Sequence, residues 1–160
     1  MKILIPMAGE GSRFSREGYT FPKPLIDVRG KPMIQSVVEN LDFDCEYIFL
    51  VRKEHIEKYS GLFDTLDRIT NGRFKHVEVD GLTEGAACTA LLAEEYIDND
   101  LPLSITTLDM YFEPYFDPSD VDGDGTVLTF DADNPAYSYS QLGEDGYVIR
   151  TAEKEVISNN

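Results

Sequence analysis

Short apolar runs alternate along this chain with longer stretches in which apolar residues recur at helical spacing. Such alternation is typical of a mostly parallel sheet with helices on both faces and right-handed crossovers between its strands. We therefore expect an α/β, Rossmann-like fold. The predicted strands are 3–5, 47–51, 75–79, 103–108, 126–130 and 147–150, and the predicted helices are 32–41, 54–69 and 84–97.

The segment after the first strand has the composition of an anion-binding loop. Ala8, Gly9 and Gly11 remove side-chain bulk at this point, so successive backbone N–H groups can point toward an anion. Arg13 adds a planar cation suited to phosphate oxygens, and Lys23 adds a point charge on a segment stiffened by flanking prolines. These residues predict a phosphate site rather than an ordinary turn with incidental charges.

Two other glycine motifs do not fit this loop. The dinucleotide-binding fingerprint needs a third glycine where Phe14 stands, and a helix directly after the turn, which we expect Pro22 and Pro24 to forbid. A Walker loop needs Ser or Thr after its Gly-Lys pair, whereas the pair at 30–31 is followed by Pro32. The loop therefore belongs to neither class.

The segments GEGSRF and FPKPLI, at 9–14 and 21–26, resemble the signature of the nucleotidyltransferases that activate sugar phosphates. This group includes glucose-1-phosphate thymidylyltransferases and phosphocholine cytidylyltransferases. The similarity continues through GKPMIQSVVENL, TEGAACTALLAEEYIDND and AEKEVISNN, and so covers essentially the whole chain. It implies a GT-A-like nucleotidyltransferase fold that transfers a nucleoside monophosphate from a nucleoside triphosphate to a phosphorylated sugar or alcohol, releasing pyrophosphate. The EGAACT variant resembles members of capsule and surface polysaccharide pathways, which favours CTP or UTP.

The resemblance implies a role for each matching residue. Arg13 and Lys23 would be catalytic, with Arg13 stabilising the departing pyrophosphate and Lys23 bridging the α-phosphate and the incoming phosphate. Asp109 would bind Mg²⁺, while Glu153 and Lys154 would hold the hydroxyls and the phosphate of the acceptor. The nucleotide-binding residues would be Ala8, Gly9, Gly11, Ser12, Arg13, Thr83 and Gly85.

Local structure offers a simpler explanation for three of these residues. Asp109 follows an apolar strand, where a carboxylate suits Mg²⁺, yet an aspartate at a strand end can also satisfy nearby backbone. Thr83 can cap the helix that follows it, and Gly85 can permit close packing. The sequence also departs from the family in two places: apolar residues flank Asp109, and Glu155 replaces the proline that usually follows the Glu-Lys pair.

Five residues fit the pattern of a calcium-binding EF-hand loop: Asp120, Asp122, Asp124, Gly125 and Asp131. An EF-hand needs a helix on each side, whereas prolines precede this loop and an apolar β-like run follows it. We expect an acidic turn that leads into a strand, with calcium binding as the alternative.

Length and charge limit the classes of function. A chain of 160 residues is sized for one domain, 1–160, in which 1–109 would form the nucleotide-binding half and 110–160 the start of the acceptor-binding half. Residues 1–80 carry 12 Lys+Arg and 13 Asp+Glu, whereas residues 81–160 carry 2 and 17. Nucleic acid is therefore not an expected partner, because a polyanion needs a positive stripe.

The sequence also predicts a cellular compartment. Neither a signal peptide nor an apolar stretch of 18 residues is present, which predicts a cytoplasmic protein with no membrane partner. Cys45 and Cys88 have no neighbouring Cys or His at metal-site spacing, and we expect Cys88 to pack in the core.

Family members usually continue beyond the segment that resembles AEKEVISNN, with more sheet, part of the acceptor pocket and a second acidic metal ligand. This chain stops at Asn160, so we expect a fold shortened at its C-terminus. Two functions remain as alternatives: an active nucleotidyltransferase, or a non-catalytic module that binds a nucleotide or a phosphosugar. Missing C-terminal elements would expose sheet edge and apolar surface, which favours self-association into homo-oligomers.

Overall fold

The computed structural model describes residues 1–41, 44–111, 121 and 123–159 of the chain. Contacts within the chain divide it into two compact units, Met1–Tyr115 and Phe116–Asn160. The expectation of one domain with halves at 1–109 and 110–160 stays a prediction.

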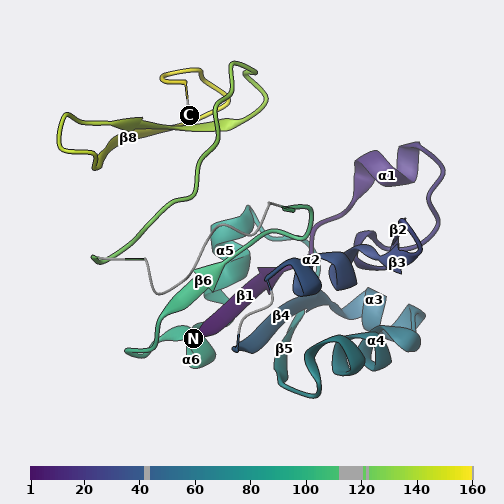
Figure 1. The fold of residues 1–160 in the computed structure, drawn as a ribbon. Coiled ribbons are helices and arrows are strands. Elements are labelled where there is room, and N and C mark those ends of the chain that lie inside the picture. Colours follow the sequence, from purple (N-terminus) through teal and green to yellow (C-terminus); the bar gives the residue numbers. More distant parts are fainter. Residues whose placement is uncertain (42–43, 112–120, 122, 160) are drawn as a thin grey trace. The chain divides into compact units, whose positions relative to one another are not determined.

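The first unit contains a four-stranded sheet in which all neighbouring strands are parallel (Figure 1). The strand order is β5-β4-β1-β6, which confirms the predicted α/β fold with a parallel sheet. The strands are β1 (Lys2–Pro6), β4 (Glu46–Arg52), β5 (Phe74–Val79) and β6 (Leu103–Ile105).

The last of these strands, β6, is shorter than the predicted 103–108. Its pairing with β1 continues only to the amide of Thr106, which donates to the carbonyl of Leu4 at 3.1 Å. The chain then turns at Leu108 and Asp109. Asp109 therefore stands in a turn beyond the end of the strand, rather than directly after its last residue.

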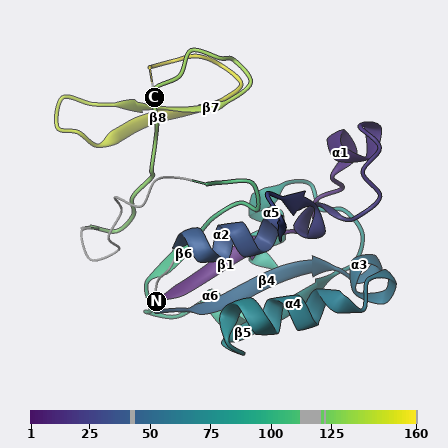
Figure 2. The same cartoon turned by 45° about the vertical axis from the view of Figure 1, so that its right-hand side comes forward.

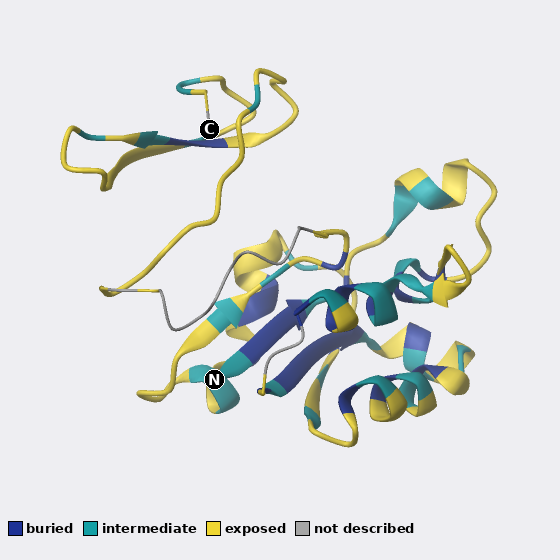
Figure 3. Cartoon of the chain, viewed as in Figure 1, coloured by how far each residue is buried: buried dark blue, intermediate teal, exposed yellow. Residues whose placement is uncertain are grey.

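Helices cover both faces of this sheet because its central strands are apolar on both sides. On one face, Ile3 and Ile5 pack with the buried residues of α2 (Met33–Leu41) and α4 (Gly61–Thr70), which lie in front of the sheet in Figure 2. On the other face, Leu4 packs with Ala90 of α5 (Ala86–Leu91) and with Ala93 of the turn after it. Figure 3 shows β1 and β4 buried along most of their length.

The predicted helix 54–69 is two helices, α3 (Lys53–Lys58) and α4. The backbone leaves the helical region at Tyr59, where φ is −123° and ψ is 83°. The expectation of one continuous helix is therefore wrong. Apolar side chains of both helices nevertheless pack in the same core, among them Ile56 from α3 and Leu62 from α4.

The predicted helix 84–97 is also interrupted, since α5 is followed by a separate short helix, α6 (Glu94–Ile97). The expectation that Thr83 caps this helix is wrong, because the first turn of α5 has no side-chain cap hydrogen bond. Cys88 is exposed on α5, so its predicted place in the core is wrong as well; Thr89 and Ala90 are the buried residues of this helix.

A short helix, α1 (Ser12–Arg16), begins directly after the glycine turn. The sequence argument that prolines forbid a helix here is therefore wrong, because five helical residues fit before Pro22 is reached. A single 3-10 turn, η1 (Lys23–Leu25), follows, and a small antiparallel pair, β2 (Asp27–Val28) and β3 (Lys31–Pro32), leads into α2.

The second unit contains an antiparallel hairpin of β7 (Ser138–Leu142) and β8 (Val148–Glu153). The strand predicted at 147–150 is thus present, whereas 126–130 forms no strand and its apolar side chains are exposed. In the EF-hand-like segment, Asp120 and Asp122 lie outside the described residues. The described part of the chain contains no cluster of three or more acidic, His or Cys side chains that could hold a metal ion.

Among the described residues, no helix has both the length and the apolar composition needed to cross a membrane.

Candidate functional site

The topology of the sheet brings two chain segments together at one edge. The chain runs outward from β1 to β4 and β5, and then returns to place β6 on the other side of β1. Parallel α/β sheets bind ligands beyond the carboxyl ends of their strands, at the point where the strand order reverses. Here that point lies between β1 and β6, and the glycine loop follows β1 while Asp109 follows β6.

The two glycines of this loop have different surroundings. Gly11 precedes α1 with φ 64° and ψ 23°, a left-handed conformation that side chains disfavour, and a Cβ on it would lie 3.6 Å from Cβ of Lys23. Gly9 has no positive φ, and a Cβ on it would meet no atom within 4 Å. The fold itself thus requires Gly11, whereas Gly9 leaves open space beside the backbone.

Lys23 and Asp109 form an ion pair in this structure. Nζ of Lys23 lies 2.7 Å from Oδ2 of Asp109 and 5.8 Å from the centre of the Phe14 ring. The Lys23 side chain is 22% exposed and that of Asp109 is 57% exposed. Lys23 sits in η1 between Pro22 and Pro24, both buried, so its backbone is held firmly.

Electrostatics keep the carboxyl group of Asp109 ionised. Partial burial raises the pKa of Asp109, but the hydrogen bond and the charge of Lys23 lower it, as does a hydrogen bond from Thr107. The net result is a pKa below the usual value for aspartate. The alternative that Asp109 only satisfies nearby backbone is therefore incomplete, since its main stabilising partner is the distant Lys23.

The other residues of the predicted phosphate loop precede Lys23 in the sequence. Ala8 is buried at the end of β1, and Ser12 begins α1. Arg13 is exposed on α1 and has no ion-pair partner within the described ranges. Its guanidinium is thus available to an anion.

The segment at the start of α5 is fixed by hydroxyl groups. The hydroxyl oxygens of Thr83 and Thr89 lie 2.5 Å apart, and each is 3.1 Å from the carbonyl oxygen of Gly85. The backbone of Gly85 is extended, and a Cβ there would meet nothing within 4 Å, so close packing does not explain this glycine. Thr89, which sequence reasoning missed, is nearly buried and helps to hold the turn.

The predicted acceptor residues belong to the second unit. Nζ of Lys154 lies 2.9 Å from Oε1 of Glu153, whose carboxylate also accepts a hydrogen bond from the hydroxyl of Ser138. These bonds lower the pKa of Glu153, the Ser138 bond most. Glu155 pairs with Arg150 at 3.0 Å, so this extra acid has a partner other than Lys154.

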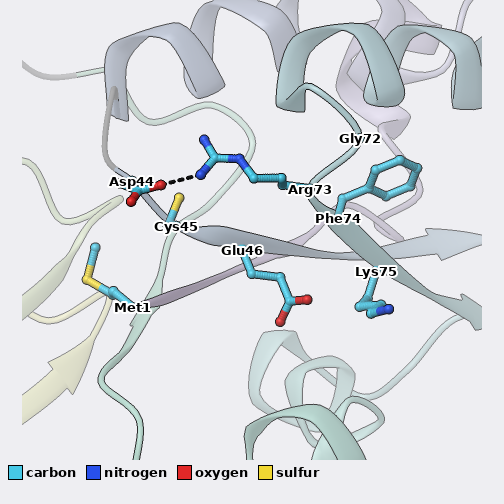
Figure 4. Close-up of a pocket in the computed structure, with 8 residues that line it drawn as sticks. All are labelled: Met1, Asp44, Cys45, Glu46, Gly72, Arg73, Phe74 and Lys75. Carbon is cyan, nitrogen blue, oxygen red and sulfur yellow. Dashed lines mark hydrogen bonds and ion pairs between the residues drawn. The ribbon is translucent and has the colours of Figure 1, made fainter.

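Cavities open on the described part of the first unit. One cavity, of about 480 Å³, lies at the amino-terminal ends of β1, β4 and β5, at the opposite edge of the sheet from the glycine loop. The buried Cys45 and the ion pair of Arg73 with Asp44 line it (Figure 4). Burial raises the pKa of the Cys45 thiol. Another, of about 390 Å³, is at the carboxyl ends of β4 and β5 and is lined by Arg52, Lys53, Glu54, Glu57, Val79, Asp80 and Gly81. It therefore adjoins, in sequence, the segment from Thr83 to Gly85.

Comparison with known proteins gives the fold and the relatives of this chain. No family model matches it. The protein called "Bifunctional protein GlmU" of Methanococcus maripaludis is 28% identical over 155 residues, which are 96% of this chain and 36% of that protein. The GlmU of Methanocaldococcus jannaschii is 30% identical over 100 residues, 62% of this chain and 23% of that protein. This chain thus spans about a third of the length of these curated relatives, or less.

This chain is also similar to solved structures. The nucleoside-diphosphate-sugar pyrophosphorylase of Vibrio cholerae is 26% identical, with a TM-score of 0.78 over 98% of this chain and 68% of its own. The inositol-1-phosphate CTP transferase of T. maritima has the same fold, with a TM-score of 0.77, 16% identity, and coverage of 99% of this chain and 66% of its own. The chain therefore has the nucleotidyltransferase fold, and its homologues are sugar nucleotidyltransferases, which confirms the resemblance drawn from its motifs.

Proposed function

We propose that this chain transfers a nucleoside monophosphate from a nucleoside triphosphate to a phosphorylated sugar or alcohol, and releases pyrophosphate. The observation that carries the proposal is the convergence of the glycine loop, Lys23 and Asp109 at the reversal of strand order between β1 and β6. Sugar and CTP nucleotidyltransferases among the homologues and the fold neighbours support the same reaction.

The proposed reaction is an in-line attack by an acceptor phosphate oxygen on the α-phosphorus of the triphosphate. The bond from the α-phosphorus to the bridging oxygen breaks as the new P–O bond forms, and pyrophosphate departs with the bonding pair. No covalent enzyme intermediate is needed, so the protein contributes positioning and charge neutralisation. Arg13 would neutralise the departing pyrophosphate, and Lys23 would bridge the two reacting phosphates.

The nucleotide would lie along the loop and the start of α5. Ala8, Gly9 and Gly11 would present backbone N–H groups to the phosphates together with Ser12. Open space at Gly9 and at Gly85 supports this placement, because neither glycine is needed for packing within the described chain. Thr83 and Gly85 would lie against the nucleoside, and a pyrimidine triphosphate, CTP or UTP, is the proposed substrate.

Asp109 is the proposed Mg²⁺ ligand. A single carboxylate suits this ion, because Mg²⁺ usually keeps several waters and takes its other oxygens from substrate phosphates. The lowered pKa of Asp109 fits the donor that such an ion needs, since the carboxylate stays ionised at neutral pH. When bound, the ion would supply charge neutralisation at the phosphates, while Lys23 would turn from Asp109 to the phosphate oxygens.

The acceptor would be held by the second unit. Glu153 would accept hydrogen bonds from acceptor hydroxyls, and Lys154 would pair with the acceptor phosphate. Both side chains are about two-thirds exposed, so a ligand can reach them.

A non-catalytic module that binds a nucleotide or a phosphosugar is the alternative. Its support is the two departures from the family pattern, the apolar residues that flank Asp109 and the Glu155 that follows the Glu-Lys pair. The test is exchange of radiolabelled pyrophosphate into CTP, UTP, dTTP, ATP and GTP, with sugar phosphates and phosphorylated alcohols present. An acceptor is needed because, without a covalent intermediate, label enters the triphosphate only through the nucleotidylated acceptor. The melting temperature is measured with each triphosphate and with each acceptor. An enzyme catalyses exchange with at least one triphosphate. A binding module melts at a higher temperature with a triphosphate or with a phosphorylated acceptor and shows no exchange. The absence of both effects refutes both functions.

A further inference from the structure

We infer that Tyr59 is a positioning residue that holds the segment carrying Lys23. The inference rests on the proposed function, because it assigns Tyr59 a part in presenting Lys23 to the triphosphate. Tyr59 stands at the break between α3 and α4, where sequence periodicity predicts a continuous helix. The break places this tyrosine against a loop 39 residues earlier in the chain.

Two contacts join Tyr59 to that loop. Its hydroxyl donates a hydrogen bond to the carbonyl oxygen of Thr20 at 2.9 Å. Its ring lies 6.0 Å from the ring of Phe21, centre to centre, with the two planes tilted by 42°. Thr20 and Phe21 directly precede the rigid Pro22–Pro24 segment in which Lys23 stands.

The loop has little hydrogen bonding of its own at this point. The amide of Tyr19 donates to the carbonyl of Phe14 at 3.1 Å, and the next backbone donor bond is that of Leu25 to Pro22 at 2.8 Å. Within the described ranges, the amides of residues 20, 21 and 23 have no backbone acceptor. The bond from Tyr59 therefore fixes the stretch between two anchored points.

Tyr59 itself is firmly held. Its amide donates to the carbonyl of His55 at 3.0 Å, and its own carbonyl accepts from the amide of Leu62 at 3.0 Å. Leu62 is fully buried, and His55 is 8% exposed and lies edge-on to the Tyr59 ring at 6.4 Å. Because α3 follows β4 directly, these contacts link the central sheet to the loop.

Removal of the hydroxyl alone is the informative change. Tyr59→Phe keeps the ring against Phe21 and loses only the bond to Thr20. A hydrogen bond of this kind is worth a factor of about 2 to 10 in an equilibrium constant. We expect affinity for CTP or UTP with Mg²⁺, measured by calorimetry, to fall by about that factor.

Tyr139→Phe is the matched control. The Tyr139 hydroxyl donates to the carbonyl of Asn134 at 2.8 Å, so the same chemical change removes the same kind of bond in the other unit. We expect it to leave nucleotide affinity unchanged. A general effect of losing a tyrosine hydroxyl would appear equally in both variants.

A double-mutant cycle separates positioning from simple structural support. If Tyr59 acts through Lys23, Tyr59→Phe has no further effect on nucleotide affinity in a Lys23→Ala background. An equal loss in both backgrounds overturns the inference. So does unchanged affinity of Tyr59→Phe in the wild-type background.

Hydrogen exchange of the protein alone tests the contact without any nucleotide. We expect faster exchange in a peptide covering 18–26 for Tyr59→Phe and not for Tyr139→Phe, and equal exchange in both overturns the inference. If the wild-type chain binds none of the triphosphates, the proposed function fails and the positioning role fails with it. In that case faster exchange still assigns the contact to Tyr59 as a structural tether.

Discussion

Replacement of Lys23 by alanine separates its chemistry from its part in stability. The variant loses the 2.7 Å ion pair with Asp109 and the contact with the Phe14 ring. Asp109 is more than half exposed, so the pair contributes about 0.2–1 kcal/mol. The ring contact adds about 0.5–1 kcal/mol. For a chain of this size, a combined loss below about 2 kcal/mol lowers the melting temperature by at most about 8 °C.

The expected loss of turnover is far larger. Removal of one group that stabilises developing charge in a transition state typically lowers turnover by about 10²–10³-fold. We therefore expect Lys23→Ala to remain folded by circular dichroism while its rate of pyrophosphate exchange falls by at least about 100-fold. The melting temperature and the exchange rate are measured on the same preparation.

Lys31→Ala is the matched control for this variant. Lys31 pairs with Glu39 at 2.6 Å on the surface of the first unit, so its removal changes the net charge equally and also breaks one ion pair. We expect normal exchange in this control. Near-normal exchange in Lys23→Ala, or an equal loss in Lys31→Ala, would refute the role given to Lys23.

Three further changes test the site and the packing. Lys23 lowers the pKa of Asp109, so the ionised carboxylate stabilises the fold above the ordinary pKa of aspartate and loses this effect as the pH falls through the lowered pKa. In urea unfolding, the difference in unfolding free energy between wild type and Asp109→Asn should be constant above about pH 5 and shrink below about pH 4. Gly11→Ala should cost about 1–2 kcal/mol of unfolding free energy because of its positive φ, whereas Gly9→Ala should leave stability unchanged and weaken triphosphate binding measured by calorimetry. Cys88 should react with a thiol reagent in the folded protein, and Cys45 only after unfolding.

The central strands β1 and β4 could be predicted because burial on both faces leaves a continuous apolar run. Ile3–Ile5 and 47–51 each lie within the observed strand and fall short of it by one residue at each end. The second unit lacks this signal. β7 reads Ser-Tyr-Ser-Gln-Leu and was missed, whereas the apolar run at 126–130 is largely exposed and has no strand partner in the described part of the chain.

The breaks in the helices could not be predicted from periodicity. Ile56 and Leu62 pack in one core on either side of Tyr59, so the apolar pattern continues through the interruption. At the break, the hydroxyl of Tyr59 contacts Thr20, which is far away in sequence. The spacing of apolar residues indicates which face of a helix is buried, but it does not indicate a break at which the chain contacts a distant loop.

The candidate site was more accessible to sequence reasoning than the fold around it. The glycine loop and Asp109 each follow a strand, so the rule for parallel sheets assigns both to one edge. The pairing of Asp109 with Lys23 needed the structure, because Lys23 lies in a loop whose path no local pattern specifies. Thr89 was missed for a related reason, since a threonine inside a helix gives no signal that its hydroxyl contacts Gly85.

The exposure of the Lys23–Asp109 pair suits the exchange of partners that the proposed reaction requires. In the structure, the ammonium and the carboxylate neutralise each other. In the proposed complex, Lys23 pairs with phosphate and Asp109 with Mg²⁺, so each group exchanges one partner for another of the same sign. A fully buried pair would resist this exchange, because loss of one partner there costs about 3–5 kcal/mol. The Asp109 side chain is 57% exposed, so water screens the ion pair. Exposed pairs contribute at most about 1 kcal/mol, and the substrate can therefore separate these two charges at about that cost.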